Sequence, residues 1–65
     1  MKLRVNGEEE VVDAMTLADY LARRELVGKR IAVEHNGEIV PKSAFETIQL
    51  CDGDVLEIVH AIGGG

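Results

Sequence analysis

Three turn dipeptides constrain the fold of this chain more than any other feature of its sequence: Asn6-Gly7, Asn36-Gly37 and Asp52-Gly53. Such a dipeptide between strand-forming residues is the strongest short-range signal for a β-hairpin, because a type I′ turn needs two consecutive residues with positive φ. We therefore expect a chain of short strands that reverses direction at these sites.

The residues beside the turns alternate between apolar and polar side chains, which is typical of strands with one buried face. The strands predicted in this way cover residues 2–5, 10–12, 31–35, 38–40, 48–51 and 54–62. The last and longest strand is apolar on both faces, with Val55 and Val59 on the face opposite Leu56 and Ile58. We expect it to lie mid-sheet with both faces partly covered.

One segment has helical spacing instead. Leu17, Tyr20 and Leu21 share one face of a helix, Thr16 is a suitable N-cap, and Gly28 can stop the chain after the helix. If the first and last strands pair in parallel, the connection between them must cross over and carry this helix. The prediction is an α+β protein of the β-grasp (ubiquitin-like) class, a mixed sheet of four to five strands packed on one main helix at about 16–25. This domain would span residues 1–62.

The chain is too small to hold both a packed core and a deep cleft. It has 65 residues, and a domain of this size buries about 60% of the surface that its unfolded chain exposes. Aromatic residues make up 3% of the chain, so the core must be built from aliphatic side chains. These properties argue against an enzyme with an enclosed active site.

The net charge of −5 arises wholly in the second half of the chain. Residues 1–30 hold six basic and six acidic residues (net 0), whereas residues 31–65 hold one basic and six acidic residues (net −5). This balance argues against binding to nucleic acid or to an anionic membrane, which both require a basic face. A partner with a basic surface fits better.

The lone cysteine, Cys51, cannot form an internal disulfide, whereas a secreted domain of this size would usually carry several. No apolar run approaches the roughly 20 residues that span a bilayer. We therefore expect a complete cytoplasmic protein.

Three glycines, Gly63, Gly64 and Gly65, directly follow the last predicted strand. Glycine has no side chain to pack and loses the most conformational freedom when it is ordered, so we expect residues 63–65 to form a flexible tail. Residues 61–65, fully extended, could reach roughly 15 Å and bring the α-carboxylate of Gly65 into a narrow active site of another protein. The alternative is a frayed end or a cloning scar without function.

Two stretches of the chain resemble the ThiS family, the sulfur carriers of thiamine biosynthesis. They are residues 31–42 (IAVEHNGEIVPK) and residues 50–65 (LCDGDVLEIVHAIGGG), and the opening residues 1–7 and the length match as well. The terminal Gly-Gly is shared with all ubiquitin-like carriers, whereas its combination with the Asn-Gly-Glu-Ile-Val-Pro segment is more specific.

The resemblance implies a carrier that is not itself an enzyme and binds no permanent cofactor. An E1-like adenylating enzyme (ThiF type) would use ATP to adenylate Gly65, and a sulfur-donor enzyme would supply the sulfur of a thiocarboxylate. Thiazole synthase (ThiG type) would then take this sulfur to form the thiazole ring. Gly63 and Gly64 would thread the tail into the active sites of these partners.

Other residues were candidates for contact or chemistry. Ile62 and His60 lie beside the tail and could contact a partner. His35, beside a turn, is most simply a solvated residue, and no set of residues has the spacing of a metal site. Cys51 has no basic neighbour in sequence to form a thiolate, so we interpret it as a strand-end residue.

Three rival functions stay open at this level. They are a sulfur carrier of molybdopterin synthesis or ubiquitin-like modifier, an interaction module with an incidental tail, and a thiol enzyme that uses Cys51.

Two charged clusters have simple structural interpretations. We interpret the acidic run Glu8-Glu9-Glu10 as a solvated edge of the sheet. We interpret Arg23-Arg24 with Lys29-Arg30 as a small basic patch or as the basic end of the helix.

Overall fold

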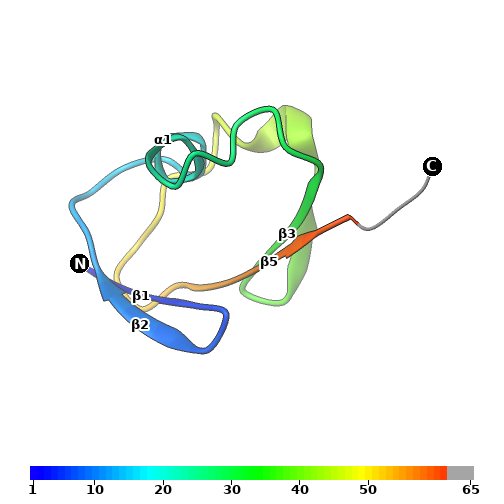
Figure 1. The fold of residues 1–65 in the computed structure, drawn as a ribbon. Coiled ribbons are helices and arrows are strands. Elements are labelled where there is room, and N and C mark those ends of the chain that lie inside the picture. Colours follow the sequence, from blue (N-terminus) through cyan, green and yellow to red (C-terminus); the bar gives the residue numbers. More distant parts are fainter. Residues whose placement is uncertain (62–65) are drawn as a thin grey trace.

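The computed structural model describes residues 1–61, in which five strands form one mixed sheet and an α-helix packs on one of its faces (Figure 1). The strands and helices are β1 (Lys2–Val5), β2 (Glu8–Val11), α1 (Leu17–Arg23), β3 (Ile31–His35), β4 (Glu38–Val40), the 3-10 helix η1 (Lys42–Ala44) and β5 (Val55–His60).

The strand order is β2-β1-β5-β3-β4, which places the last strand, β5, at the centre of the sheet. β5 runs parallel to β1 and antiparallel to β3, while β1–β2 and β3–β4 are antiparallel hairpins. The connection between the two hairpins contains α1. This arrangement confirms the predicted β-grasp topology, with a parallel pair of first and last strands at the middle of the sheet.

Both Asn-Gly dipeptides form the predicted hairpin turns. The φ angles are 50° and 83° at Asn6 and Gly7, and 51° and 87° at Asn36 and Gly37, as a type I′ turn requires. At the third dipeptide only Gly53 has a positive φ, and the N–H of Asp54 donates to the carbonyl of Cys51. That turn is therefore not of type I′, and it joins no hairpin.

Two expectations for the second half of the chain are wrong. Residues 48–51 do not form a strand, because this segment lies against the start of α1, where Gln49 forms an isolated bridge with Thr16. The outer face of β5 is also open, since Val55 and Val59 are 38% and 59% exposed. α1 covers one face of the sheet, and residues 1–61 supply no second layer.

The core between α1 and the sheet is aliphatic, as predicted, with one aromatic exception. Its buried side chains are Leu3, Val5, Met15, Leu17, Tyr20, Leu21, Val33, Val40, Leu50, Leu56 and Ile58.

The exception, Tyr20, donates its hydroxyl proton to the Glu10 carboxylate over 2.8 Å, and Arg24 binds the same carboxylate. Burial, followed by the hydrogen bond to Glu10, raises the pKa of Tyr20 to about 12. Glu10 thus joins β2 to α1 and is more than a solvated edge residue.

α1 is shorter than predicted and ends in a Schellman motif at a residue that is not glycine. Thr16 caps the N-terminus, accepting from the N–H of Asp19, as expected. At the other end the N–H groups of Glu25 and Leu26 donate to the carbonyls of Ala22 and Leu21. Glu25 occupies the left-handed position (φ 59°), so the helix stops well before Gly28.

We predict that Glu25→Gly stabilises the protein. A left-handed φ costs a residue with a Cβ roughly 1–2 kcal/mol, and the greater freedom of glycine in the unfolded chain takes back about 0.5–1 kcal/mol. The free energy of unfolding in urea should therefore rise by about 0.5–1 kcal/mol. Glu46→Gly, which removes the same side chain at a residue without positive φ, is the control and should give no gain. Equal effects of the two substitutions would contradict this account of the helix end.

Candidate functional site

The candidate site is the C-terminal end of β5, which leads the chain to the side of the molecule opposite the N-terminus (Figure 1). The predicted functional residues Gly63, Gly64 and Gly65 and the predicted contact residue Ile62 lie outside the described residues, and so does the predicted domain boundary. His60 is described: it is the last residue of β5, is exposed, and lies opposite Ile31 of β3.

Main-chain pairing between the end of β5 and the residues at the start of β3 continues to the last described residue. The N–H of Ala61 donates to the carbonyl of Arg30 over 2.9 Å, one residue beyond the last strand pair. The chain that leads to Gly65 is therefore held by main-chain hydrogen bonds as far as Ala61.

Asn6 holds the other edge of β5 with its side chain. The ladder between β1 and β5 ends at Val5 and Leu56, two residues before Ile58. Beyond the ladder, the side-chain amide of Asn6 makes two hydrogen bonds to the main chain of β5. Its Nδ2 donates to the carbonyl of Ile58 over 3.1 Å, and its Oδ1 accepts from the N–H of Ile58 over 2.7 Å. One turn residue thus replaces a strand partner.

Asn36, the equivalent residue of the second hairpin turn, holds the start of β5. Its Oδ1 accepts from the N–H of Val55 over 2.8 Å, and its own N–H donates to the carbonyl of the same residue. Its Nδ2 also donates to the carboxylate of Asp54 over 3.1 Å. The two Asn-Gly turns therefore clamp β5 from opposite sides.

Asp54 is a buried carboxylate with three partners. It accepts from Asn36 and from the N–H of Cys51, and it lies 2.7 Å from Nε2 of His35. Burial by itself raises the pKa of Asp54, but the hydrogen bonds from His35, Cys51 and Asn36 together hold it below its usual value. The carboxylate thus connects the β3–β4 turn with the turn before β5.

The expectation that His35 is simply solvated is wrong. Its side chain is 22% exposed and pairs with Asp54. The two residues are far apart in sequence, so no local motif joins them. The alternation of apolar and polar residues along this strand did indicate that His35 is partly buried. His35 shares the inward face of its strand with Ile31 and Val33, and a polar group on that face needs a buried partner.

The Cys51 thiol is exposed and donates to the carbonyl of Gln49 over 3.7 Å. Within residues 1–61 there is also no group of His, Cys, Asp or Glu side chains able to hold a metal ion. No helix in this range is long and apolar enough to span a bilayer.

Comparison with known proteins identifies relatives over the whole length. A model of the ThiS family matches residues 3–65. The sulfur carrier protein ThiS of Bacillus subtilis is 43% identical over 65 residues, which cover 97% of this chain and 98% of that protein. A thiazole synthase of Paramagnetospirillum magneticum is 48% identical over 66 residues, but this chain spans 20% of its length.

A solved structure shows the same fold. The crystal structure of the thiamine biosynthesis protein (ThiS) from Geobacter metallireducens superposes with a TM-score of 0.86, at 32% sequence identity and with full coverage of both chains.

We predict that Asn6→Gly destabilises the protein by about 1–2 kcal/mol, because it removes both side-chain hydrogen bonds to Ile58 while glycine still permits the turn. Urea denaturation measures the loss. Asn6→Asp keeps the acceptor but sets a carboxylate oxygen against the Ile58 carbonyl, so at pH 7 it should destabilise the protein at least as much. If Asn6→Gly is as stable as the wild type, the clamp contributes nothing.

We also predict that the network around Asp54 stabilises the protein at neutral pH and fails in acid. Because the pKa of Asp54 is lowered in the folded state, its contribution is present above the usual value of about 3.9 and is lost as the pH falls through the lowered pKa. Asp54→Asn should lower the free energy of unfolding by about 1–3 kcal/mol at pH 7 and flatten its decline below about pH 4.

The control for this prediction is Asp13→Asn, which changes an exposed carboxylate. Its unfolding free energy should follow the wild-type decline from pH 5 to pH 2, roughly the range in which carboxylates titrate. A decline in Asp54→Asn as steep as in Asp13→Asn would contradict the prediction.

Proposed function

The chain belongs to the ThiS family, and we propose that it is a sulfur carrier of thiamine biosynthesis whose working group is the α-carboxylate of Gly65. The match spans residues 3–65, so it includes the three terminal glycines as well as the domain that carries them. This match is the observation that carries the proposal.

A carboxylate must be activated before sulfur can replace one of its oxygens. In the proposed reaction, a Gly65 carboxylate oxygen attacks the α-phosphorus of ATP on an E1-like enzyme, and pyrophosphate leaves. Sulfide released by a donor enzyme then attacks the acyl carbon as HS⁻, and AMP leaves. The resulting thiocarboxylate delivers its sulfur to thiazole synthase, so the carrier is a co-substrate and needs no cofactor of its own.

The described domain supports a carrier that presents its tail to partner enzymes. Its central strand is clamped by Asn6 and Asn36 and is paired as far as Ala61, so it presents the following residues from a firmly held position. Within residues 1–61 no group of His, Cys, Asp and Glu side chains is placed to hold a metal ion. The lone cysteine also supports a cytoplasmic location.

The longer relatives support thiazole synthase as a partner. Two proteins named thiazole synthase, from Paramagnetospirillum magneticum and Magnetococcus marinus, match all of this chain over about a fifth of their own length. A carrier-like segment and a synthase within one polypeptide are expected if the two act together. The match to the ThiS family likewise favours the thiamine pathway over molybdopterin synthesis or a plain interaction module.

We predict that incubation with the adenylating enzyme, ATP and a sulfur donor raises the intact mass of the protein by the difference between one sulfur and one oxygen atom. Fragmentation should place the added mass at Gly65. A variant that lacks Gly65 should stay unmodified, and its modification would refute the proposal.

Two substitutions separate the rival functions in the same assay. Cys51→Ser should be modified as fully as the wild type, whereas a thiol enzyme would lose its activity. Gly64→Val should block modification by adding a side chain to the tail, whereas an interaction module with an incidental tail would be unaffected.

A further inference from the structure

The outer face of the sheet, opposite α1, carries exposed apolar side chains. Ile39, Val55 and Val59 are 76%, 38% and 59% exposed there. Exposed and buried residues alternate along β5, and Ile39 precedes the buried Val40 at the end of β4, so these side chains project away from the core. Residues 1–61 supply no layer over this face. An apolar surface of this kind is typical of a contact site for another protein.

Two carboxylates face each other in the middle of this surface. Glu34 of β3 and Glu57 of β5 are direct partners in the antiparallel ladder, and both are exposed. Residues so placed have Cβ atoms about 4.5–5.5 Å apart, and like charges in this position destabilise a sheet. The ion pairs formed within residues 1–61 involve neither carboxylate. The free carrier therefore bears a repulsion that a cation from another molecule would remove.

The basic residues of the same face do not neutralise this pair. They lie on β1, on the other side of β5 from Glu34. Lys2 lies 3.9 Å from Glu9 of β2, and Arg4 donates to the carbonyl of Gly7. The negative charge of Glu34 and Glu57 thus stays open to a partner.

Apolar side chains lie beside the two carboxylates. Glu34 also pairs with Ile39 of β4, and Val59 follows Glu57 on the same face of β5, opposite Ala32. We call Glu34, Glu57, Ile39 and Val59 the outer-face patch. A guanidinium suits this patch, because its five N–H donors can serve two carboxylates and its weak hydration lets it lie beside apolar groups. The outer-face patch therefore fits a protein surface that presents one arginine among apolar side chains.

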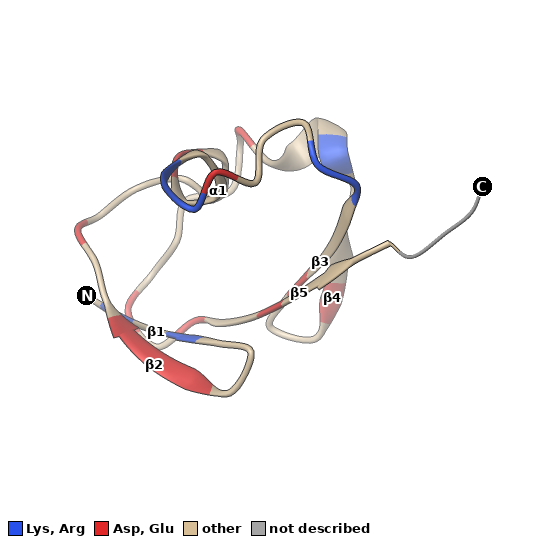
Figure 2. Ribbon diagram, in the orientation of Figure 1, with Lys and Arg blue, Asp and Glu red and all other residues tan. Residues whose placement is uncertain are grey.

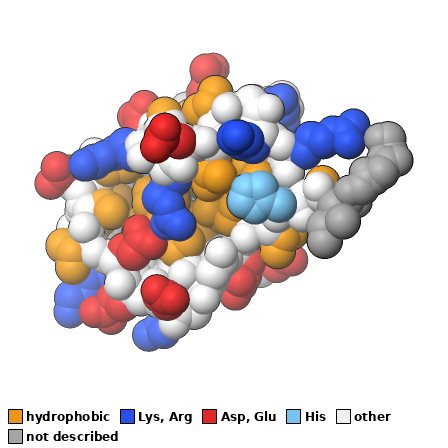
Figure 3. All heavy atoms as spheres, viewed as in Figure 1, with side chains coloured by type: hydrophobic (Ala, Val, Ile, Leu, Met, Phe, Trp, Pro, Cys, Tyr) orange, Lys and Arg blue, Asp and Glu red, His pale blue; other side chains and the backbone are white. Residues whose placement is uncertain are grey.

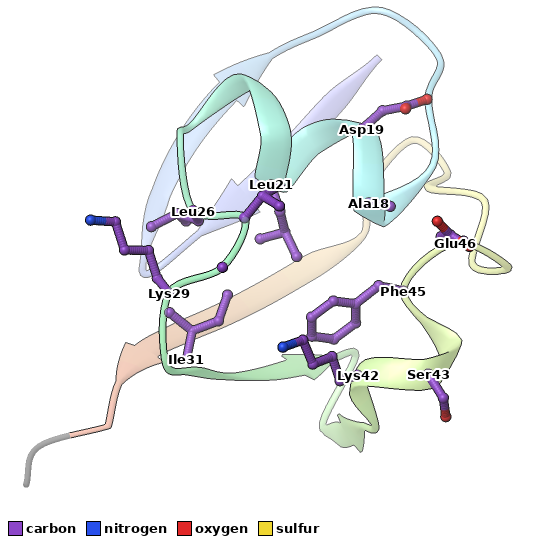
Figure 4. A pocket seen from close by; sticks show the side chains of 12 residues that line it. Ala18, Asp19, Leu21, Leu26, Lys29, Ile31, Lys42, Ser43, Phe45 and Glu46 are labelled. Carbon is purple, nitrogen blue, oxygen red and sulfur yellow. The ribbon is translucent and has the colours of Figure 1, made fainter. Parts of the chain in front are cut away.

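The α1 side of the molecule shows no comparable preference for one charge. Acidic residues lie on β2, β4 and β5, whereas α1 carries both signs of charge (Figure 2). In the view of Figure 3, basic and acidic side chains are interspersed among exposed hydrophobic ones. The hollow between α1 and η1 is lined by Lys29 and Lys42 as well as by Asp19 and Glu46, so its formal charge is zero (Figure 4).

The outer-face patch also lies beside the path that leads to the C-terminus. Val59 comes two residues before Ala61, whose main chain is still paired with Arg30. An enzyme that takes up Gly65 must therefore approach this end of β5. Of the enzymes expected to do so, thiazole synthase is the one whose namesakes among the relatives carry a carrier-like segment in the same polypeptide.

We propose that thiazole synthase docks on the outer-face patch, with one of its arginines between Glu34 and Glu57 and its apolar side chains against Ile39 and Val59. The charge of the pair supports this occupant, as does the excess of acidic residues in the second half of the chain. A second copy of this chain is a poorer occupant, because its own outer-face patch would add two more carboxylates. This inference rests on the proposed function.

The test measures the Kd between the carrier and purified thiazole synthase by titration calorimetry. Glu34→Gln and Glu57→Gln should each raise the Kd about 3–10-fold at low ionic strength, because each removes one charge that attracts the arginine. At about 0.5 M salt the difference should shrink. The matched control is Glu8→Gln, which removes an exposed carboxylate opposite Val5 on β2 and should keep the wild-type Kd.

The same charge variants should change stability in the opposite direction. Glu34→Gln should raise the midpoint of urea unfolding, because it removes the repulsion from Glu57. Weaker binding that arises from poor folding would lower this midpoint instead. A Glu34→Gln variant less stable than Glu8→Gln would therefore overturn the argument from the like-charge pair.

A further pair of variants tests the apolar part of the contact. Ile39→Ser should raise the Kd by a factor that salt does not reverse. Val27→Ser, at a valine that is 69% exposed in the loop after α1, should leave the Kd unchanged. Equal effects of the two substitutions would contradict docking on the outer face.

The outcomes separate this inference from the proposed function. If the wild type is converted to the thiocarboxylate but Glu34→Gln and Glu57→Gln match Glu8→Gln in Kd, the outer-face patch is not the docking surface and the carrier function stands. If these variants change only the KM for adenylation, the patch belongs to the adenylating enzyme and this inference is overturned. If the wild type is not modified at all, the proposed function fails and this inference falls with it.

Discussion

The structure depends on how the central strand β5 is held at its two edges. β5 has a short parallel ladder with β1, and the Asn6 side chain extends that edge to Ile58. Asn36 does the same for Val55 from the other hairpin. Each asparagine first satisfies its own turn, because it tolerates a positive φ, and then uses its amide as a substitute for strand backbone. Both hairpins are thereby fastened to the strand that leads to the C-terminus.

This construction explains how so small a domain can serve as a carrier. One aliphatic core between α1 and one face of the sheet supplies its stability, and the outer face stays open. The proposed chemistry lies beyond the domain, at Gly65, so the fold needs neither a deep cleft nor a bound cofactor. What the domain supplies is a firmly held strand end from which the chain continues to Gly65.

Much of the fold could be predicted because its signals are local. Asn-Gly turns, strand alternation and a capped helix each depend on residues a few positions apart, and they suffice for the β-grasp topology. The sequence-based predictions were wrong where the structure depends on contacts between distant segments of the chain. Residues 48–51 have strand-like residues but lie against the start of α1, and the helix stops at Glu25, in a left-handed conformation that sequence patterns assign to glycine. The pair of His35 and Asp54 was missed for the same reason, since its members meet only when the two turns are brought together.

The sequence by itself determined the order of strands and helix, the aliphatic core and the family. It also determined the terminal glycines as the proposed point of chemistry. Each of these depends on contiguous residues or on their periodicity. The tertiary structure alone decided which side chains hold β5 and that Asp54 is buried among donors. The physical reason is that hydrogen bonding, burial and electrostatics depend on distance in space, and only folding brings residues so far apart in the chain within reach of one another.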